Sequence, residues 1–365
     1  MFKILLDSPN VGELEKKYLN DAVDSGFVST YGPYVTDFEN RIAELLHVPC
    51  TVGLQSGTAA LHIALYECGI GPGDEVIIPA ITFAATAHAV LYVGATPVIV
   101  DVESDTWCIS PSATESAITS QTKAVIPVHL YGNPCDMGRM TQIAQANNFF
   151  IIEDAAESLG SKYQGQYTGT LGDLGCLSFN GNKTITSASG GMIALKDPKR
   201  AEHIRYLINQ SNPGYGFDNH GEIGYNYRLT NLSAAMGLAQ VERVHSFLNK
   251  KKDFFQIYKK HLSGMPDVFF QAEYPGAENS YWLTAILLPF HQDVDRVIHQ
   301  LKDKNIPARR FFNPLNTFKF MSGFCQGTLK NANDIYARGI CLPSSTLNEA
   351  EGIEHVCDVL KELIT

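Results

Sequence analysis

The stretch that decides the fold is VIIPAITFAATAHAVLYVGATPVIV, residues 76–100. It contains no Asp, Glu, Lys or Arg over roughly the length of a bilayer crossing. Pro79, Gly94 and Pro97 interrupt it near both ends, which argues against one membrane-spanning helix. The pattern instead predicts a strand, a helix and a second strand, all buried in the core of a globular protein.

The same alternation of strand-like and helical patterns continues along the chain. A capping box at Thr36 and Glu39 predicts a helix over 36–46, and a second helix is expected from Gly57 to just before Gly69. Strand-like runs are expected at residues 75–79, 97–101, 123–128, 149–153 and 175–179. Such βαβ units predict an α/β fold with a largely parallel sheet covered on both faces.

The pattern changes near residue 246, where a polar helix (246–262) precedes the strand-like run WLTAILLPF and a terminal helix (349–364). We therefore expect two domains, a large one over 1–245 and a small C-terminal one over 246–365. The 365 residues are 45% hydrophobic and 18% charged, as in ordinary globular proteins. The net charge of -10 argues against a nucleic-acid partner, although backbone N–H groups could still bind one small phosphorylated ligand.

The cysteines and histidines show no metal-binding pattern. The eight cysteines include no CxxC pair and the histidines form no HExxH motif, so no metal is expected. Widely spaced cysteines of this kind predict reduced thiols in a cytoplasmic protein. The N-terminal MFKILLDSPNVGELEKK has too short an apolar run for a signal peptide, and no membrane association is expected.

Lys183 lies in an unusual setting, CLSFNGNKTITSASGG, residues 176–191. A strand-like run breaks just before it, and only Ile185 interrupts the small or polar residues that follow it to Gly191. The lysine could belong to a surface turn, or its amine could be a reagent held at the end of a strand. A phosphate-binding P-loop is excluded because Asn182 stands where that motif needs glycine, and its first glycine is also missing.

Four other motifs each allow a structural and a functional interpretation. Asp154, after the strand-like FFIIE, could cap a helix or face a ligand cation. Ser56-Gly57-Thr58 could be a plain helix start or a phosphate site, and Phe83 could be core or could stack on a flat ring. In GEIGYNYRLTNLSAAMG (221–237) the tyrosines could pack while Asn and Arg bind an anion.

Pyridoxal phosphate (PLP) chemistry uses all of these motifs together. A lysine with a neutral amine forms a Schiff base with the cofactor aldehyde. An aspartate pairs with the protonated pyridine nitrogen, and a helix N-terminus with a nearby Ser binds the phosphate. The order of phosphate loop, aromatic residue, Asp154, Ser178 and Lys183 therefore predicts a PLP site.

Nearly the whole chain resembles one family, the DegT/DnrJ/EryC1/StrS aminotransferases, which are fold-type-I PLP enzymes acting on nucleotide-linked keto-sugars. The resemblance is carried by STYGPYVTDFE (29–39), SGTAALHIAL, IIEDAAESLGSKYQG, GDLGCLSFNGNKTIT, GEIGYNYRLTNLSAAMGLAQVERV and ICLPSSTLNEAE. It implies a large domain whose mostly parallel seven-stranded sheet lies between helices, and a smaller C-terminal α+β domain.

The resemblance also implies roles for individual residues. Lys183 would be the Schiff-base lysine, Asp154 the pyridinium partner, and Glu157 would lie near the ring 3-oxygen, where a second anion needs a proton or a donor partner. The remaining cofactor contacts would be Gly57, Thr58, the Ala59 N–H and Ser178 at the phosphate, and Phe83 stacked on the ring. Asn226 would reach the cofactor phosphate of a neighbouring subunit, which implies a homodimer with a shared site. Contacts to the sugar nucleotide would come from Tyr31, His220, Arg228 and Arg309.

This chain departs from the family pattern at two places. Ala188-Ser189 stands where members commonly have Gly-Glu, and Arg310 replaces the proline of a usual Arg-Pro pair. Lys183 itself separates the chain from the dehydratase branch, whose members have His there.

The resemblance favours amino transfer from L-glutamate to carbon 4 of a UDP-linked 4-keto-6-deoxy-HexNAc sugar for bacterial surface glycans. Amination at carbon 3 and a dTDP or GDP carrier remain open. A fold-type-I lyase acting on amino acids, or a PLP-binding regulatory protein, is a further alternative.

Overall fold

The computed structural model describes residues 3–214, 220–325 and 327–364. Its main sheet has seven strands in the order β1-β9-β8-β5-β4-β2-β3. Only β9 is antiparallel to its neighbours, so the sheet is mostly parallel, as expected. The strands are β1 (Cys50–Leu54), β9 (Gly191–Leu195), β8 (Leu174–Ser178), β5 (Phe150–Asp154), β4 (Thr122–Val125), β2 (Glu75–Pro79) and β3 (Thr96–Val100).

The stretch over 76–100 forms the predicted strand, helix and strand. β2 and β3 pair in parallel, and α4 (Ala85–Tyr92) connects them. All five expected strands exist within a residue or two at each end, except that β4 stops three residues early. β1 and β9 were not predicted, because a five-residue apolar run such as GMIAL does not distinguish a buried strand from a buried helix.

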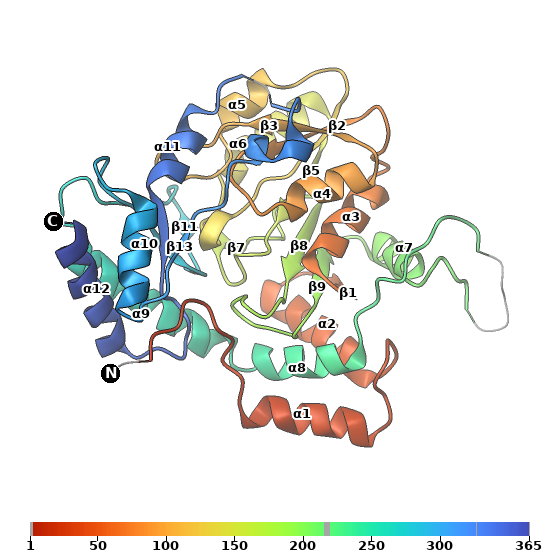
Figure 1. Cartoon of the computed structure of the whole chain (residues 1–365). Coiled ribbons are helices and arrows are strands. Elements are labelled where there is room, and N and C mark those ends of the chain that lie inside the picture. Colours follow the sequence, from red (N-terminus) through yellow and green to blue (C-terminus); the bar gives the residue numbers. More distant parts are fainter. Residues whose placement is uncertain (1–2, 215–219, 326, 365) are drawn as a thin grey trace.

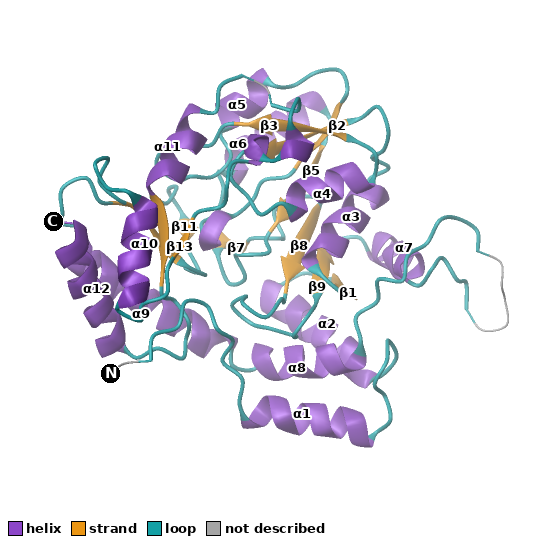
Figure 2. Ribbon diagram, in the orientation of Figure 1, coloured by secondary structure: helices purple, strands orange, loops and turns teal. Residues whose placement is uncertain are grey.

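Helices cover both faces of this sheet (Figures 1 and 2). Among them α3 packs on β8 and β9, whereas α8 packs on both α1 and α2. Besides α4, the helices of the part that contains the main sheet are α1 (Glu13–Asp24), α2 (Pro33–Leu46), α3 (Gly57–Glu67), α5 (Pro111–Ser116), α6 (Met137–Asn147), α7 (Pro198–Ile208) and α8 (Asn231–Val241), with the 3-10 turn η1 (Leu130–Gly132).

The expected start of α2 at Thr36 was wrong. The helix begins at Pro33, whose fixed φ suits the first helical position, and Gly32 is the N-cap. Glu39 therefore lies inside the helix, where its carboxylate accepts the Gly53 N–H at 2.7 Å and pairs with Arg205 at 2.7 Å.

A second sheet lies in the C-terminal part, in the order β10-β12-β14-β13. Its strands are β10 (Phe269–Phe270), β12 (Thr284–Leu287), β14 (Gly339–Leu342) and β13 (Arg309–Arg310). Its helices are α9 (Val244–Leu262), α10 (Val294–Asp303), α11 (Lys330–Arg338) and α12 (Ala350–Ile364), with the 3-10 turns η2 (Leu315–Thr317) and η3 (Lys319–Met321). A small third sheet links the two parts, because β11 (Ala277–Glu278) pairs with β6 (Lys162–Tyr163), which pairs with β7 (Gln166–Tyr167).

Residues 3–11, called here the N-terminal strap, lie against the C-terminal part, and both termini are on that side of the molecule (Figure 1). The side chain of Ile4 belongs to the same apolar cluster as α9 and α12. The Ser344 N–H donates to Leu6 O at 2.6 Å, and the Leu5 N–H donates to Asn348 Oδ1 at 2.8 Å. The domain boundary near 245 stays a prediction, and the strap shows that the first residues pack with the smaller part.

All eight cysteines are free thiols. In the described part of the chain, no helix combines the length and apolar character needed to cross a bilayer.

Candidate active site

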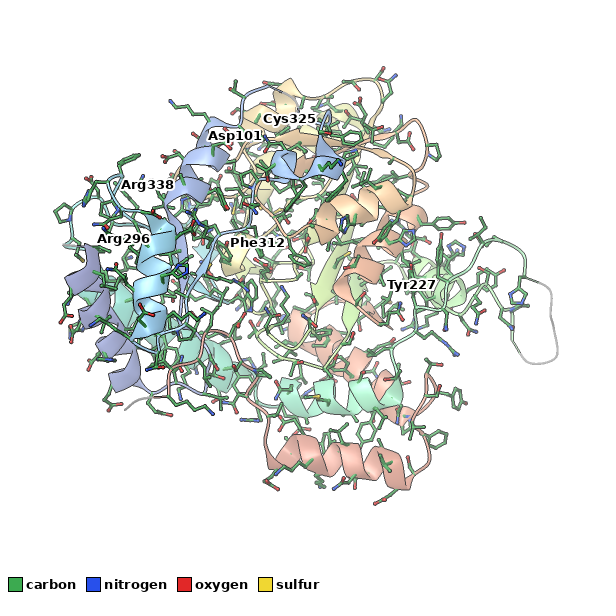
Figure 3. The ribbon with its side chains drawn as sticks, viewed as in Figure 1. Asp101, Tyr227, Arg296, Phe312, Cys325 and Arg338 are labelled. Carbon is green, nitrogen blue, oxygen red and sulfur yellow. The ribbon has the colours of Figure 1, made fainter. Side chains whose placement is uncertain are left out.

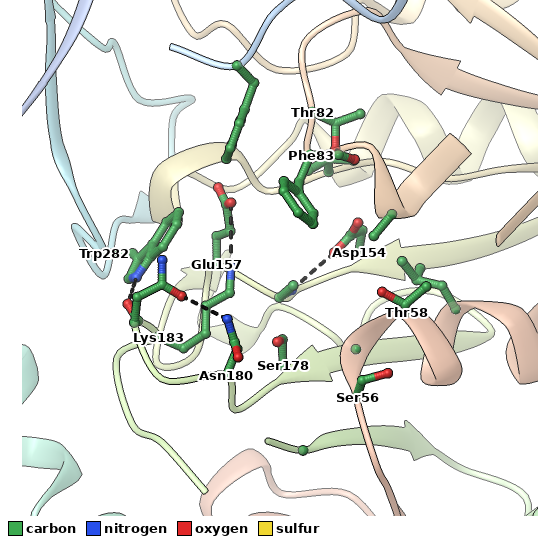
Figure 4. Close-up of a pocket in the computed structure, with 18 of the residues that line it drawn as sticks. Ser56, Thr58, Thr82, Phe83, Asp154, Glu157, Ser178, Asn180, Lys183 and Trp282 are labelled. Atoms are coloured by element: carbon green, nitrogen blue, oxygen red, sulfur yellow. Dashed lines mark hydrogen bonds and ion pairs between the residues drawn. The ribbon is translucent and has the colours of Figure 1, made fainter. Parts of the chain in front are cut away.

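A cavity of about 320 Å³ opens where the main sheet meets the C-terminal part (Figure 4). Its sheet side is formed at the carboxyl ends of β2, β4, β5 and β8, where ligands gather in open α/β sheets. Eight of the predicted residues line it, namely Gly57, Thr58, Phe83, Asp154, Glu157, Ser178, Lys183 and Arg309.

The amine of Lys183 lies inside this cavity, not in a solvated turn. Its Nζ is 3.6 Å from Glu157 Oε1 and 4.0 Å from the centre of the Trp282 ring. Burial lowers the pKa of Lys183, and the nearby Arg309 charge lowers it further, against the opposing effect of Glu157 and Asp154. A lowered pKa increases the fraction of neutral amine, which is the nucleophilic form.

Asp154 is buried at the end of β5, beneath the cavity. Thr86 Oγ1 donates to its Oδ2 at 2.8 Å, and the Ala156 N–H donates to its Oδ1 at 3.2 Å. Burial raises the pKa of Asp154, whereas these two bonds and the charge of Lys183 favour the carboxylate. A carboxylate held in this way fits a cationic ring nitrogen as its partner.

Glu157 has the donor partners that a second buried anion requires. Its Oε2 accepts the Tyr131 N–H at 2.9 Å, and its Oε1 faces Lys183. Burial raises the pKa of Glu157, and Lys183 opposes that rise. The Lys183–Glu157 pair therefore places an amine and a carboxyl group side by side in a site largely shielded from water.

The start of α3 provides space for a phosphate. Gly57 allows α3 to lie against β8, since a Cβ there would come within 2.8 Å of the Ser178 Cβ. Thr58 and Ser178 add hydroxyl groups to the N-terminus of the helix, which favours an anion. Ala59 is not among the residues that line the cavity, and its N–H donates to Ser56 Oγ at 3.1 Å as part of the helix cap.

Phe83 is not a core residue, since 60% of its surface is exposed. Its ring points into the cavity between Glu157 and Asp154 in the view of Figure 4. The Phe312 ring lies 5.9 Å away, centre to centre, so two aromatic rings border the same space.

Besides Ala59, four predicted contacts lie outside the cavity. Tyr31 is 68% exposed, and the Nδ1 atom of His220 lies 2.6 Å from Gln210 O. Asn226 is exposed and bridges to Asn209, whereas Arg228 has a buried Nε without a hydrogen-bond partner in the part of the chain described. None of them lines the cavity of a single chain.

The tyrosines next to Asn226 are packing residues. Tyr225 and Tyr227 both contact the ring of His62 on α3, and Tyr227 lies beside that helix in Figure 3. Thr230 caps the following helix α8 by accepting the Ser233 N–H at 3.1 Å.

Sequence reasoning missed most of the opposite side of the cavity. Trp282 and Phe312 come from the C-terminal part, and Phe312 lies near the middle of the molecule in Figure 3. The Trp282 Nε1–H donates to Asn182 O at 2.7 Å, which ties this side to the residue before the lysine. The other unpredicted lining residues include Thr82, Asn180, Asn182 and Ser189.

The loop that departs from the family pattern borders the cavity without a carboxylate. Ser189 lines it, and its Oγ donates to Gln55 O at 2.8 Å. Ala188 adopts a φ of 65°, a left-handed conformation that favours glycine.

The chemistry of these residues fits PLP. A lysine of lowered pKa, a buried carboxylate, two aromatic rings and a helix N-terminus with hydroxyl groups all border one space. In the described residues no group of three or more His, Cys, Asp or Glu could hold a metal ion.

Comparisons with known proteins agree with this geometry. The GDP-perosamine synthase of Escherichia coli O157:H7 is 40% identical and the alignment covers 97% of this chain and 96% of that protein. The GDP-perosamine synthase of Vibrio cholerae is 36% identical, with 97% of each chain covered. The structure of Spr1654 from Streptococcus pneumoniae in its PLP form, described as a sugar aminotransferase, covers 100% of both chains with a TM-score of 0.93 and 29% identity. With a match over residues 9–361, the chain belongs to the DegT/DnrJ/EryC1/StrS aminotransferase family.

Proposed function

We propose that this PLP-dependent aminotransferase moves an amino group from L-glutamate to carbon 4 of a GDP-linked 4-keto-6-deoxy sugar. The buried amine of Lys183, beside Glu157 in a cavity that Asp154 also lines, is the observation that supports the transfer chemistry. Three relatives named GDP-perosamine synthases, aligned over 97–99% of this chain, support the GDP-linked sugar.

The residues have separate tasks in this proposal. Bound PLP supplies the electron sink that makes the substrate carbon acidic. Lys183 Nζ holds the cofactor and, once free, carries the proton to and from that carbon as a general base and acid. The Asp154 carboxylate keeps the ring nitrogen protonated, and Gly57, Thr58 and Ser178 hold the phosphate.

The C-terminal side of the cavity shields this chemistry and meets the substrate. Trp282 and Phe312 exclude water, and Arg309 offers a guanidinium to an anionic substrate group. Asn226 is exposed outside the cavity of its own chain, which is consistent with a homodimer in which it reaches the neighbouring site.

The expected UDP-linked HexNAc sugar gains little support from relatives that span the whole chain. The UDP-N-acetyl-3-dehydro-alpha-D-glucosamine 3-aminotransferase of Acidithiobacillus ferrooxidans is 41% identical but aligns with only 62% of this chain. A GDP-linked sugar therefore replaces the UDP-linked HexNAc as the favoured substrate, whereas amination at carbon 4 is kept, and the product would still serve surface-glycan synthesis.

One experiment tests both the chemistry and the carrier. The PLP-loaded enzyme is incubated with L-glutamate and, separately, GDP-, UDP- and dTDP-linked 4-keto-6-deoxy sugars and a UDP-linked 3-keto-HexNAc. Products are identified by mass, and the aminated carbon by NMR. We expect the GDP-linked 4-amino product. Preference for a UDP-linked sugar would overturn the carrier, and no product from any of them would overturn the sugar substrate.

A further inference from the structure

The carboxylate of Asp7 lies where three distant segments meet beside the cavity. Asp7 belongs to the N-terminal strap, and its side chain is only 19% exposed. Asn182 Nδ2 donates to Asp7 Oδ2 at 2.9 Å, and Arg309 Nη1 lies 3.4 Å from the same oxygen. One carboxylate oxygen therefore contacts both the lysine-bearing loop and the C-terminal part.

The contact with Asn182 bears directly on the reactive amine. Asn182 precedes Lys183, and its carbonyl oxygen accepts the Trp282 Nε1–H at 2.7 Å. The Trp282 ring in turn lies 4.0 Å from Lys183 Nζ. Holding the Asn182 side chain thus limits movement of both the lysine and the ring that covers it.

The contact with Arg309 determines how the guanidinium is presented. Its guanidinium carbon lies 5.5 Å from the centre of the Trp282 ring and 5.7 Å from that of Phe312. Asp7 is its only ion-pair partner within 4.0 Å among the described residues. The Nη2 atom is buried and has no hydrogen-bond partner in the described chain. Because Asp7 engages Nη1 alone, the guanidinium keeps donor capacity for a bound anion.

Asp7 is itself held by the C-terminal part. The Ser345 Oγ–H donates to Ser8 O at 2.7 Å, and the Ser344 N–H donates to Leu6 O at 2.6 Å. The buried Nζ of Lys251 then donates to both Ser344 O and Trp282 O, at 3.0 and 2.9 Å. The strap and the Trp282 segment are therefore fixed to the same buried cation.

We propose that Asp7 is a positioning residue of the active site, whose carboxylate orients Arg309 toward the substrate and holds the Asn182–Lys183 loop against Trp282. It acts through these residues and does not line the cavity. The inference rests on the PLP chemistry of the proposed function and does not depend on the identity of the sugar.

The test compares Asp7→Ala with a matched variant, Ser345→Ala. Both weaken the attachment of the strap region, but only the first removes the carboxylate from Arg309 and Asn182. The PLP-loaded enzymes are titrated with acid and base while the cofactor absorbance is followed, which reports proton binding at Lys183 Nζ without any substrate. Thermal unfolding, kcat and KM are measured on the same samples, and Asp7→Asn, which keeps an acceptor oxygen, serves as the conservative variant.

We expect Asp7→Ala to move the absorbance midpoint to lower pH, because the uncompensated guanidinium then disfavours positive charge at Nζ. We also expect kcat/KM to fall about 10-fold, mainly through KM, with partial recovery in Asp7→Asn. Ser345→Ala leaves the Asp7 carboxylate in place, so it should change both quantities much less than Asp7→Ala does. An unchanged or raised midpoint in Asp7→Ala, or the same changes in Ser345→Ala, would overturn the proposal. If instead the sugar assignment fails, the absorbance titration still decides the role of Asp7.

Discussion

The two sides of the cavity differ in how they are built. The reactive groups of the sheet side are Asp154, Glu157, Ser178 and Lys183, which end or follow the adjacent parallel strands β5 and β8. The C-terminal side consists of Trp282, Arg309 and Phe312, which come from separate loops and the short strand β13. Carboxylates and the amine are buried on the first side, whereas the second offers mainly aromatic rings and one guanidinium.

The difference indicates a division of labour. Asp154 and Ser178 are fixed by the ladder of the main sheet, and Glu157 and Lys183 follow them within a few residues, so the reactive groups start from a rigid element. The C-terminal side depends on hydrogen bonds between distant segments, such as that from Trp282 Nε1 to Asn182 O. We therefore expect changes on the sheet side to reduce kcat, and changes on the C-terminal side to alter KM and stability more.

Replacing Lys183 with Ala should have the largest effect. Loss of the amine removes both the attachment of the cofactor and the general base, so turnover should fall by about 1,000-fold or more. The absorbance band of the lysine-linked cofactor should vanish as well. Lys123→Ala, at an exposed strand position, is the control. Substantial activity in Lys183→Ala would refute the role of the sheet side.

Replacing Asp154 with Asn should lower kcat by about 100-fold, because a neutral side chain no longer keeps the ring nitrogen protonated. The cofactor-free protein should respond differently. Burial raises the pKa of Asp154 in the folded state, so the folded protein binds its proton more tightly than the unfolded chain. That contribution to stability is present at low pH and is lost as pH rises through the raised pKa.

Asp154→Asn should therefore lack this part of the pH dependence of stability. At neutral pH it should be no less stable than wild type. Thermal unfolding of the cofactor-free proteins between mildly acidic and neutral pH measures it. Asp24→Asn, at an exposed position on α1, is the control for charge removal. A large loss of stability in Asp154→Asn at neutral pH would contradict the assigned cause of the pKa shift.

The same contrast explains how much could be predicted from the sequence. Asp154 and Ser178 end strands that the alternating pattern locates, so the sheet side follows from local motifs together with parallel topology.

The other side of the cavity could not be predicted in this way. Trp282 lies in YWLTAILLPF, a run whose pattern predicts only a strand. No local feature of the sequence indicates that its indole ring lies over Lys183. Asp7 lies in a segment without a motif, and its contact with Arg309 joins positions far apart in the chain. The segment at Ala59 fits both a helix cap and a phosphate site, because the two share one pattern; its N–H caps α3 through Ser56, and its contact with a phosphate stays a prediction.

Replacing Lys251 with Met tests the attachment of the C-terminal side. Burial lowers the pKa of Lys251 from 10.5 to about 8, so between these values the unfolded chain binds a proton that the folded protein does not. Stability from this group therefore rises with pH across that window, by about 3 kcal/mol in full. Lys251→Met should lack this rise of stability with pH. At neutral pH its KM should increase, because Trp282 O and Ser344 O lose their hydrogen-bond donor.

The measurement is the free energy of unfolding at several pH values from neutral to alkaline. Other groups titrate in that range, so the quantity of interest is the difference from wild type. Lys252→Met, exposed on the same helix, is the control. An identical pH dependence in Lys251→Met and wild type would show that the buried ammonium does not carry the effect.

The smallest expected effect concerns Ala188, in the loop that closes the sheet side. Its φ of 65° places a Cβ in the left-handed region, which costs about 1–2 kcal/mol for residues other than glycine. Ala188→Gly removes that strain but makes the unfolded chain more flexible, so a net gain of about 0.5–1 kcal/mol is expected. Ala117→Gly, at a right-handed φ of -94° after α5, should instead destabilise the protein. Chemical unfolding of both variants measures the difference, and a gain in both or in neither would show that Ala188 is not strained. Unchanged kcat in Ala188→Gly would further show that this loop borders the sheet side without positioning Lys183.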